Sequence, residues 1–90
     1  MRVAVISESF LPTVNGVTGS VCKVLEHLRD RGDKAIVIAP AAGAPAEYAG
    51  FRVHEVPALA YRQFPVGLPS PLVQRILSDF QPDVLHAASP

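Results

Sequence analysis

Ninety residues limit this chain to one small domain, which can bury only about 60–65% of the surface that its unfolded form exposes. Apolar residues make up 49% of the sequence and charged residues 18%, a balance that fits a folded segment and excludes a disordered tail. Eight basic residues balance eight acidic ones, so the chain has no excess charge with which to bind nucleic acid or an anionic membrane. We therefore expect no nucleic-acid partner.

The first residues lack the pattern of a targeting or membrane segment. The apolar run of residues 3–6 is too short for a secretory signal, and a membrane span needs about 20 apolar residues. Cys22 is the single cysteine, so it can form neither an internal disulfide nor a two-thiolate metal site, which suits a reducing compartment. The sequence therefore predicts a cytoplasmic protein.

The first forty residues predict a strand, a helix and a second strand. Residues 2–6 are β-branched and apolar on both faces, as in a parallel sheet covered by helices. Residues 10–20 contain Pro, Asn and Gly and predict a loop, after which apolar side chains recur at spacings of three and four, as on one face of a helix. Gly32 suits the end of this helix, and the apolar residues 35–39 predict a parallel strand.

The next segment predicts a loop and a third strand. Residues 41–50 are rich in Ala, Gly and Pro, which is typical of a surface loop, and residues 51–56 form a strand that Pro57 ends.

A second helix and a fourth strand complete the predicted fold. Ser70 suits the N-cap, Pro71 the first helical position, and an apolar stripe extends to Phe80. Residues 83–86 begin the last strand. The order β-α-β-β-α-β predicts the α/β class, with a partial Rossmann-like open parallel sheet.

Two loops at the carboxyl ends of these strands are candidate ligand sites, because helix N-termini direct backbone N–H groups toward that edge of an open α/β sheet. The first spans residues 9–18. Gly16 has no side chain to keep a phosphate from the backbone, and the helix start beside it has unpaired donors and a favourable dipole. Asn15 and Gly16 can equally form an ordinary tight turn. No G-x-G-x-x-G or Walker lysine motif follows the first strand, which disfavours dehydrogenases and P-loop NTPases.

The second loop follows the last strand, where residues 85–90 leave the sheet. His86 at this position can donate to a sugar hydroxyl or act near neutral pH, or can be a structural residue at the strand end. His27 and His54 have no partner at metal-ligand spacing, so we expect no metal site.

Four other polar or aromatic residues are weaker candidates. Glu8 and Ser9 lie at the exit of the first strand, but no paired carboxylate accompanies them to indicate acid–base catalysis. Tyr61 and Arg62 mix aromatic and basic groups that suit an acceptor sugar or lipid headgroup, although a solvent-facing loop is the favoured explanation, because loops lie at the surface by default.

Several stretches resemble glycosyltransferase family 4, which has the GT-B fold. They are RVAVISESFLP at residues 2–12, VNGVT at residues 14–18, LRDRG at residues 28–32 and PDVLHAASP at residues 82–90. The likeness is strongest to the actinobacterial GDP-mannose-dependent α-mannosyltransferases of lipid glycan assembly, and residues 41–66 match only in layout.

The resemblance implies a retaining, metal-independent and cofactor-free transfer of a hexose, expected to be mannose from GDP-mannose, to a glycan or lipid-linked acceptor. It places Asn15, Gly16 and Val17 at the donor diphosphate and aligns His86 with a family histidine at the end of the fourth strand. Many relatives carry a second histidine two positions later, where this chain has Ala88.

The resemblance also implies that residues 1–90 are part of the N-terminal, acceptor-side domain, without the domain that holds most of the nucleotide sugar. We therefore expect the chain alone to be inactive and the parent protein to lie in the cytoplasm, at the inner face of the membrane. Two alternatives remain: a non-catalytic or self-associating Rossmann-like module, and a flavodoxin-like or response-regulator domain. The last needs an acidic cluster or a hydroxyl-rich flavin loop, of which only Glu8 is present.

Overall fold

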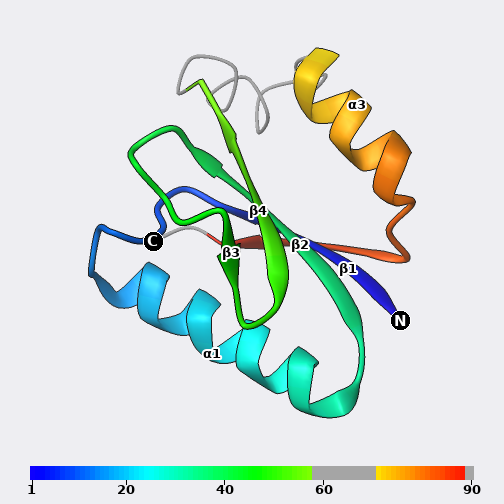
Figure 1. Cartoon of the computed structure of the whole chain (residues 1–90), viewed down its shortest axis with the longest axis horizontal. Helices are drawn as coiled ribbons and strands as arrows, with labels where there is room; N and C mark the ends of the chain where they lie inside the picture. Colours follow the sequence, from blue (N-terminus) through cyan, green and yellow to red (C-terminus); the bar gives the residue numbers. More distant parts are fainter. Residues whose placement is uncertain (58–70, 89–90) are drawn as a thin grey trace.

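The computed structural model describes residues 1–57 and 71–88, which form a mostly parallel sheet between two helices (Figure 1). In these residues the sheet order is β3-β4-β2-β1-β5. The strands are β1 (Arg2–Ser7), β2 (Lys34–Pro40), β3 (Glu47–Tyr48), β4 (Phe51–Val56) and β5 (Val84–Ala88). β1, β2, β4 and β5 pair in parallel, and β3 pairs antiparallel with β4.

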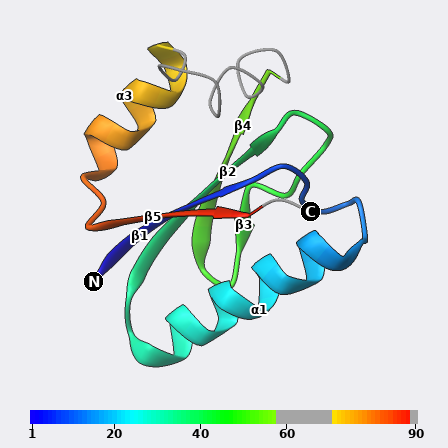
Figure 2. The same ribbon diagram turned by 180° about the vertical axis from the view of Figure 1, so that it is seen from behind.

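The helices α1 (Gly16–Arg31) and α3 (Pro71–Phe80) cover opposite faces of the sheet (Figures 1 and 2). Val5 faces the cluster on the α1 side, and the next residue, Ile6, faces the cluster on the α3 side, because successive side chains of a strand alternate. Both are buried. The predicted class, α/β with a partial Rossmann-like open parallel sheet, is confirmed.

The start of α1 differs from the prediction of a loop over residues 10–20. Asn15 is the N-cap: its backbone is extended and its side-chain oxygen accepts a hydrogen bond from the Thr18 N–H at 2.9 Å. Gly16 and Gly19 are therefore helical. The low helix propensity of glycine suggested a loop, but one capping side chain and the apolar stripe that follows outweigh it.

Residues 41–50 were predicted to be a surface loop, and this was wrong for part of the segment. Tyr48 pairs with Phe51 across a two-residue turn in which Ala49 and Gly50 both have positive φ, at 54° and 84°. This matches a type I′ hairpin turn. Alanine rarely adopts that conformation, so the sequence did not indicate a hairpin.

The helix predicted from Pro71 to Phe80 is confirmed, whereas its predicted N-cap, Ser70, lies outside the described residues. Arg2 anchors the end of this helix to β1. Its Nε donates to the Phe80 carbonyl at 2.9 Å, and its guanidinium lies 4.2 Å from the centre of the Phe80 ring. The amino edge of the sheet is thus fixed by side-chain contacts.

Gly32, the C-cap of α1, and Gly19, inside the helix, should respond oppositely to alanine. Gly32 ends the helix with φ of 78°, which a Cβ disfavours, so Gly32→Ala should lower the free energy of unfolding by about 1 kcal/mol. Gly19 is helical, and a Cβ at this position would meet nothing within 4 Å, so Gly19→Ala should raise it by roughly 0.5–1 kcal/mol. Urea unfolding of both variants measures the difference. Equal signs would contradict the assignment of the helix end.

Candidate functional site

The strand order reverses at β1. From β1 the chain passes through α1 to β2 and then to β4 on one side, whereas β5 lies on the other side of β1. Ligands of open α/β sheets bind outside the carboxyl ends of the strands where the order reverses. The ends of β1 and β5, with the N-terminus of α1, therefore form the candidate site.

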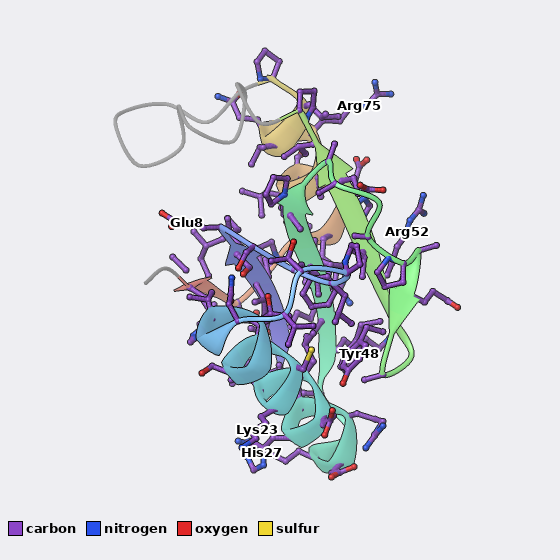
Figure 3. All side chains as sticks on the ribbon, turned by 90° about the vertical axis from the view of Figure 1, so that its left-hand side faces the viewer. Glu8, Lys23, His27, Tyr48, Arg52 and Arg75 are labelled. Atoms are coloured by element: carbon purple, nitrogen blue, oxygen red, sulfur yellow. The ribbon has the colours of Figure 1, made fainter. Side chains whose placement is uncertain are left out.

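The ends of β1 and β5 are joined by backbone hydrogen bonding. Ser7, which is fully buried, is in register with Ala88, and the Glu8 N–H donates to the Ala88 carbonyl at 3.1 Å. The Glu8 side chain is exposed where β1 ends (Figure 3). The floor of the site is thus two paired strand ends.

Three polar side chains fix the entry to α1. The Oδ1 atom of Asn15 accepts from the Thr18 N–H and, at 3.2 Å, from the Ser9 hydroxyl, which also lies 3.3 Å from the Thr18 hydroxyl. A backbone N–H can only donate, so the amide oxygen must face the helix. The Asn15 amide nitrogen consequently points away from it. Sequence reasoning missed the roles of Ser9 and Thr18, which the serine-to-cap spacing could have indicated.

The three predicted phosphate-binding residues are contiguous at this end of α1. Gly16 and Val17 occupy the first two helical positions, where backbone N–H groups have no intrahelical acceptor. A Cβ at Gly16 would meet nothing within 4 Å, and the first turn contains no acidic residue to offset the dipole. The arrangement suits an anion, but contact with a phosphate stays a prediction.

His86, which was predicted at the end of the last strand where the chain leaves the sheet, is the third residue of β5. It is in register with Val5, so its side chain lies on the α1 face of the sheet, two residues before the strand ends, and it is exposed. The alanines that follow have low strand propensity and suggested an exit from the sheet. Pairing with β1 through Ala88 overrides that preference.

The remaining candidates are dispersed. Tyr61 and Arg62 lie outside the described residues. His27 lies on the exposed side of α1 with Lys23 (Figure 3). His54 is half-buried in β4, where burial and then the nearby Arg52 charge lower the pKa of its imidazole.

Residues 1–57 and 71–88 contain no group of three His, Cys, Asp or Glu side chains close enough together to hold a metal ion. None of the helices in these two ranges has the length and apolar character needed to cross a membrane.

A carboxylate that sequence reasoning overlooked lies beside this edge of the sheet. Oε2 of Glu55 accepts from three consecutive backbone N–H groups, those of Ala42, Gly43 and Ala44, at 3.0, 3.1 and 3.3 Å. The Ala42 and Ala44 hydrogen bonds are the main cause that lowers the pKa of Glu55. No local sequence pattern links Glu55 to a loop eleven or more residues earlier.

Tyr48 links β3 to α1 through a side-chain hydrogen bond. Its hydroxyl donates to Oε2 of Glu26, and this hydrogen bond, followed by one with Cys22, raises the pKa of the phenol. Because an ionised carboxylate only accepts hydrogen bonds, the phenol is the donor.

A doubly wound sheet whose first helix begins with glycine at the reversal point defines a Rossmann-like α/β protein. A sequence profile of Glycosyltransferase Family 4 matches residues 14–90. The chain belongs to glycosyltransferase family 4.

Named relatives agree with this membership. The chain is 47% identical over 97 residues to a GDP-mannose-dependent alpha-mannosyltransferase of Corynebacterium glutamicum, covering 100% of the chain and 24% of that protein. It is 47% identical over 98 residues to the protein of that name in Mycolicibacterium smegmatis, covering 100% of the chain and 26% of the relative. Sulfoquinovosyl transferase SQD2 of Arabidopsis thaliana is 33% identical over 81 residues, which is 86% of the chain and 16% of SQD2.

The chain thus spans about a quarter of the length of the mannosyltransferases that it matches. No solved structure matched it.

The Glu55 hydrogen bonds predict an acid-dependent stability. Because the folded pKa lies below the ordinary value of 4.5, the carboxylate stabilises the fold above that pH, and the stabilisation is lost as the pH falls through the lowered pKa. Glu55→Gln should therefore have a lower free energy of unfolding than wild type at pH 7, and this gap should close as the pH falls below 4.5 and through the lowered pKa. Urea unfolding across this range measures it, with Glu47→Gln as the control for net charge. A gap independent of pH would contradict the prediction.

Proposed function

We propose that this chain is part of a retaining glycosyltransferase that transfers a hexose, mannose from GDP-mannose, to a glycan or lipid-linked acceptor. The observation that carries the proposal is the Gly16 end of α1 at the reversal point of the sheet, in a chain 47% identical to proteins named GDP-mannose-dependent alpha-mannosyltransferases. In this proposal, residues 1–90 belong to the acceptor-side domain.

The donor diphosphate would be held by the N-terminus of α1. Gly16 and Val17 would donate backbone N–H groups, and Asn15 would donate from the amide nitrogen that its capping oxygen turns outward. The positive end of the helix dipole would offset part of the diphosphate charge, so the proposal needs neither a metal ion nor a cofactor at this site.

His86, Tyr61 and Arg62 complete the proposed set. His86 is exposed on the α1 face near the end of β5 and is proposed to contact the transferred sugar through its imidazole. The resemblance implies a further histidine at the position of Ala88, so His86 would make this contact without that neighbour. Tyr61 and Arg62 are proposed on the acceptor side.

Catalysis would require more than the present chain, because the relatives are about four times as long. We propose that the intact enzyme acts in the cytoplasm, at the inner face of the membrane, and that the 90-residue chain alone is inactive.

The donor contact is tested by Gly16→Ala and Gly16→Val in the full-length protein. A side chain at this position meets open space in the fold and should instead crowd the diphosphate. We expect the affinity for GDP, measured by calorimetry, to fall stepwise, by roughly tenfold for valine, the equivalent of about one charge-assisted hydrogen bond. Unchanged affinity would remove Gly16 from the donor site.

Asn15→Asp, studied in the same titration, separates the effect on GDP binding from an effect on folding. Aspartate caps a helix as well as asparagine does, so the melting temperature should stay near that of wild type. Its negative charge and the loss of the amide donors should nevertheless weaken GDP binding. A variant that binds GDP normally would leave Asn15 with a capping role alone.

The isolated chain is also proposed to self-associate through β5. Val84 and Leu85 lie on opposite faces of this edge strand and are 43% and 45% exposed, and the strand contains neither charge nor proline to prevent pairing. Sedimentation of the 90-residue chain should show a mass that rises with concentration, and Leu85→Lys should suppress the rise. A concentration-independent monomer would contradict this.

A further inference from the structure

The carboxylate of Glu55 holds the segment that follows β2 in one conformation. Three successive N–H groups converge on its Oε2 atom, and Gly43, with φ of 82°, supplies the left-handed residue that lets neighbouring N–H groups point the same way. Glu55 is itself fixed by β4, whose pairing with β2 includes Ala39 opposite Glu55. One side chain on a rigid strand thus sets the path of residues 42–44.

Residues beyond this point pack against the loop between β1 and α1. Ala44 and Tyr48 join the hydrophobic cluster on the α1 face, in which Phe10 is 3% exposed. The Phe10 and Tyr48 rings meet edge to face, with centroids 5.9 Å apart and an interplanar angle of 87°. The Tyr48 hydroxyl also donates to Glu26 of α1. The segment from Ala44 to Tyr48 therefore supports the loop from one side.

Phe10 is the buried anchor of that loop. Its carbonyl accepts from the Thr13 N–H at 3.0 Å, and its neighbour Ser9 donates to Asn15, the N-cap of α1. Residues 12–16 are exposed, so the loop is held in place at its base. A displacement of Phe10 would be transmitted to Asn15 over a short, hydrogen-bonded stretch.

We propose that Glu55 is a positioning residue for the N-terminus of α1: it fixes residues 42–44, and these, with Tyr48, hold Phe10 and the loop that ends at Asn15. Glu55 contacts no ligand in this arrangement and acts through the loop. The identity of the ligand rests on the function proposed above, whereas the coupling between the two segments does not.

The test uses the full-length protein with Glu55→Gln and Glu55→Ala, and Glu47→Ala as the matched control. Glu47 is an exposed glutamate of β3 opposite Arg52, and the three N–H groups of residues 42–44 donate to Glu55 and not to Glu47. Hydrogen–deuterium exchange is followed in peptides covering residues 8–15, 41–48 and 71–80, and GDP affinity is measured by calorimetry.

We expect exchange to rise in Glu55→Ala by roughly threefold or more in both 41–48 and 8–15, with 71–80 unchanged. Glu55→Gln keeps an acceptor oxygen but no charge, so its exchange rates should lie between those of Glu55→Ala and wild type. The exchange rates of Glu47→Ala should match those of wild type. GDP affinity should fall by about threefold in Glu55→Ala, a size typical of coupling through a packed segment.

The outcomes are separable. Faster exchange in 41–48 with no change in 8–15 would overturn the coupling, and no change in 41–48 would overturn the role of the carboxylate. A wild-type protein that does not bind GDP would instead defeat the proposed function, while the exchange comparison would still decide whether Glu55 positions the loop.

Discussion

Parallel pairing of β1 with neighbours on both sides is the constraint on which the rest of the structure depends. β1 is hydrogen-bonded to β2 along one edge and to β5 along the other, and its residues from Val3 to Ser7 are buried. A strand enclosed in this way must be apolar on both faces and must have a helix over each. The same pairing places the start of α1 beside the paired ends of β1 and β5.

The amino and carboxyl edges of the sheet differ in whether their polar groups are hydrogen-bonded within the fold. At the amino edge, Arg2 satisfies the last carbonyl of α3, and Asp83 accepts from the backbone of Arg2. At the carboxyl edge, the first two N–H groups of α1 remain without an intrahelical acceptor. Polar groups that are satisfied within the fold favour stability, whereas donors left at a helix start favour a ligand, which is why we assign the site to the carboxyl edge.

Sequence patterns predicted the fold class and most element boundaries because strand and helix periodicities are local properties of the chain. They placed Asn15, Gly16 and Val17 correctly at the edge of the sheet but mistook the first turn of α1 for loop, since capping is a contact between a side chain and a backbone group three residues away. The chain was expected to leave the sheet around His86, whereas Ala87 and Ala88 continue β5 by pairing with Ile6 and Ser7 of β1. The Glu55 contacts could not be predicted, because the donors are backbone N–H groups, which nearly every residue type supplies.

The two hydrophobic clusters described for the fold share no side chain, since one is built from Val3, Val5 and their neighbours and the other from Ala4, Ile6 and theirs. The sheet backbone alone separates them. Substitutions on the buried face of α3 and on the buried face of α1, which lie on opposite sides of the sheet, should therefore contribute independently to the free energy of unfolding. In evolutionary terms, the α3 face is free to change its packing without disturbing the face that supports the candidate ligand-binding end of α1.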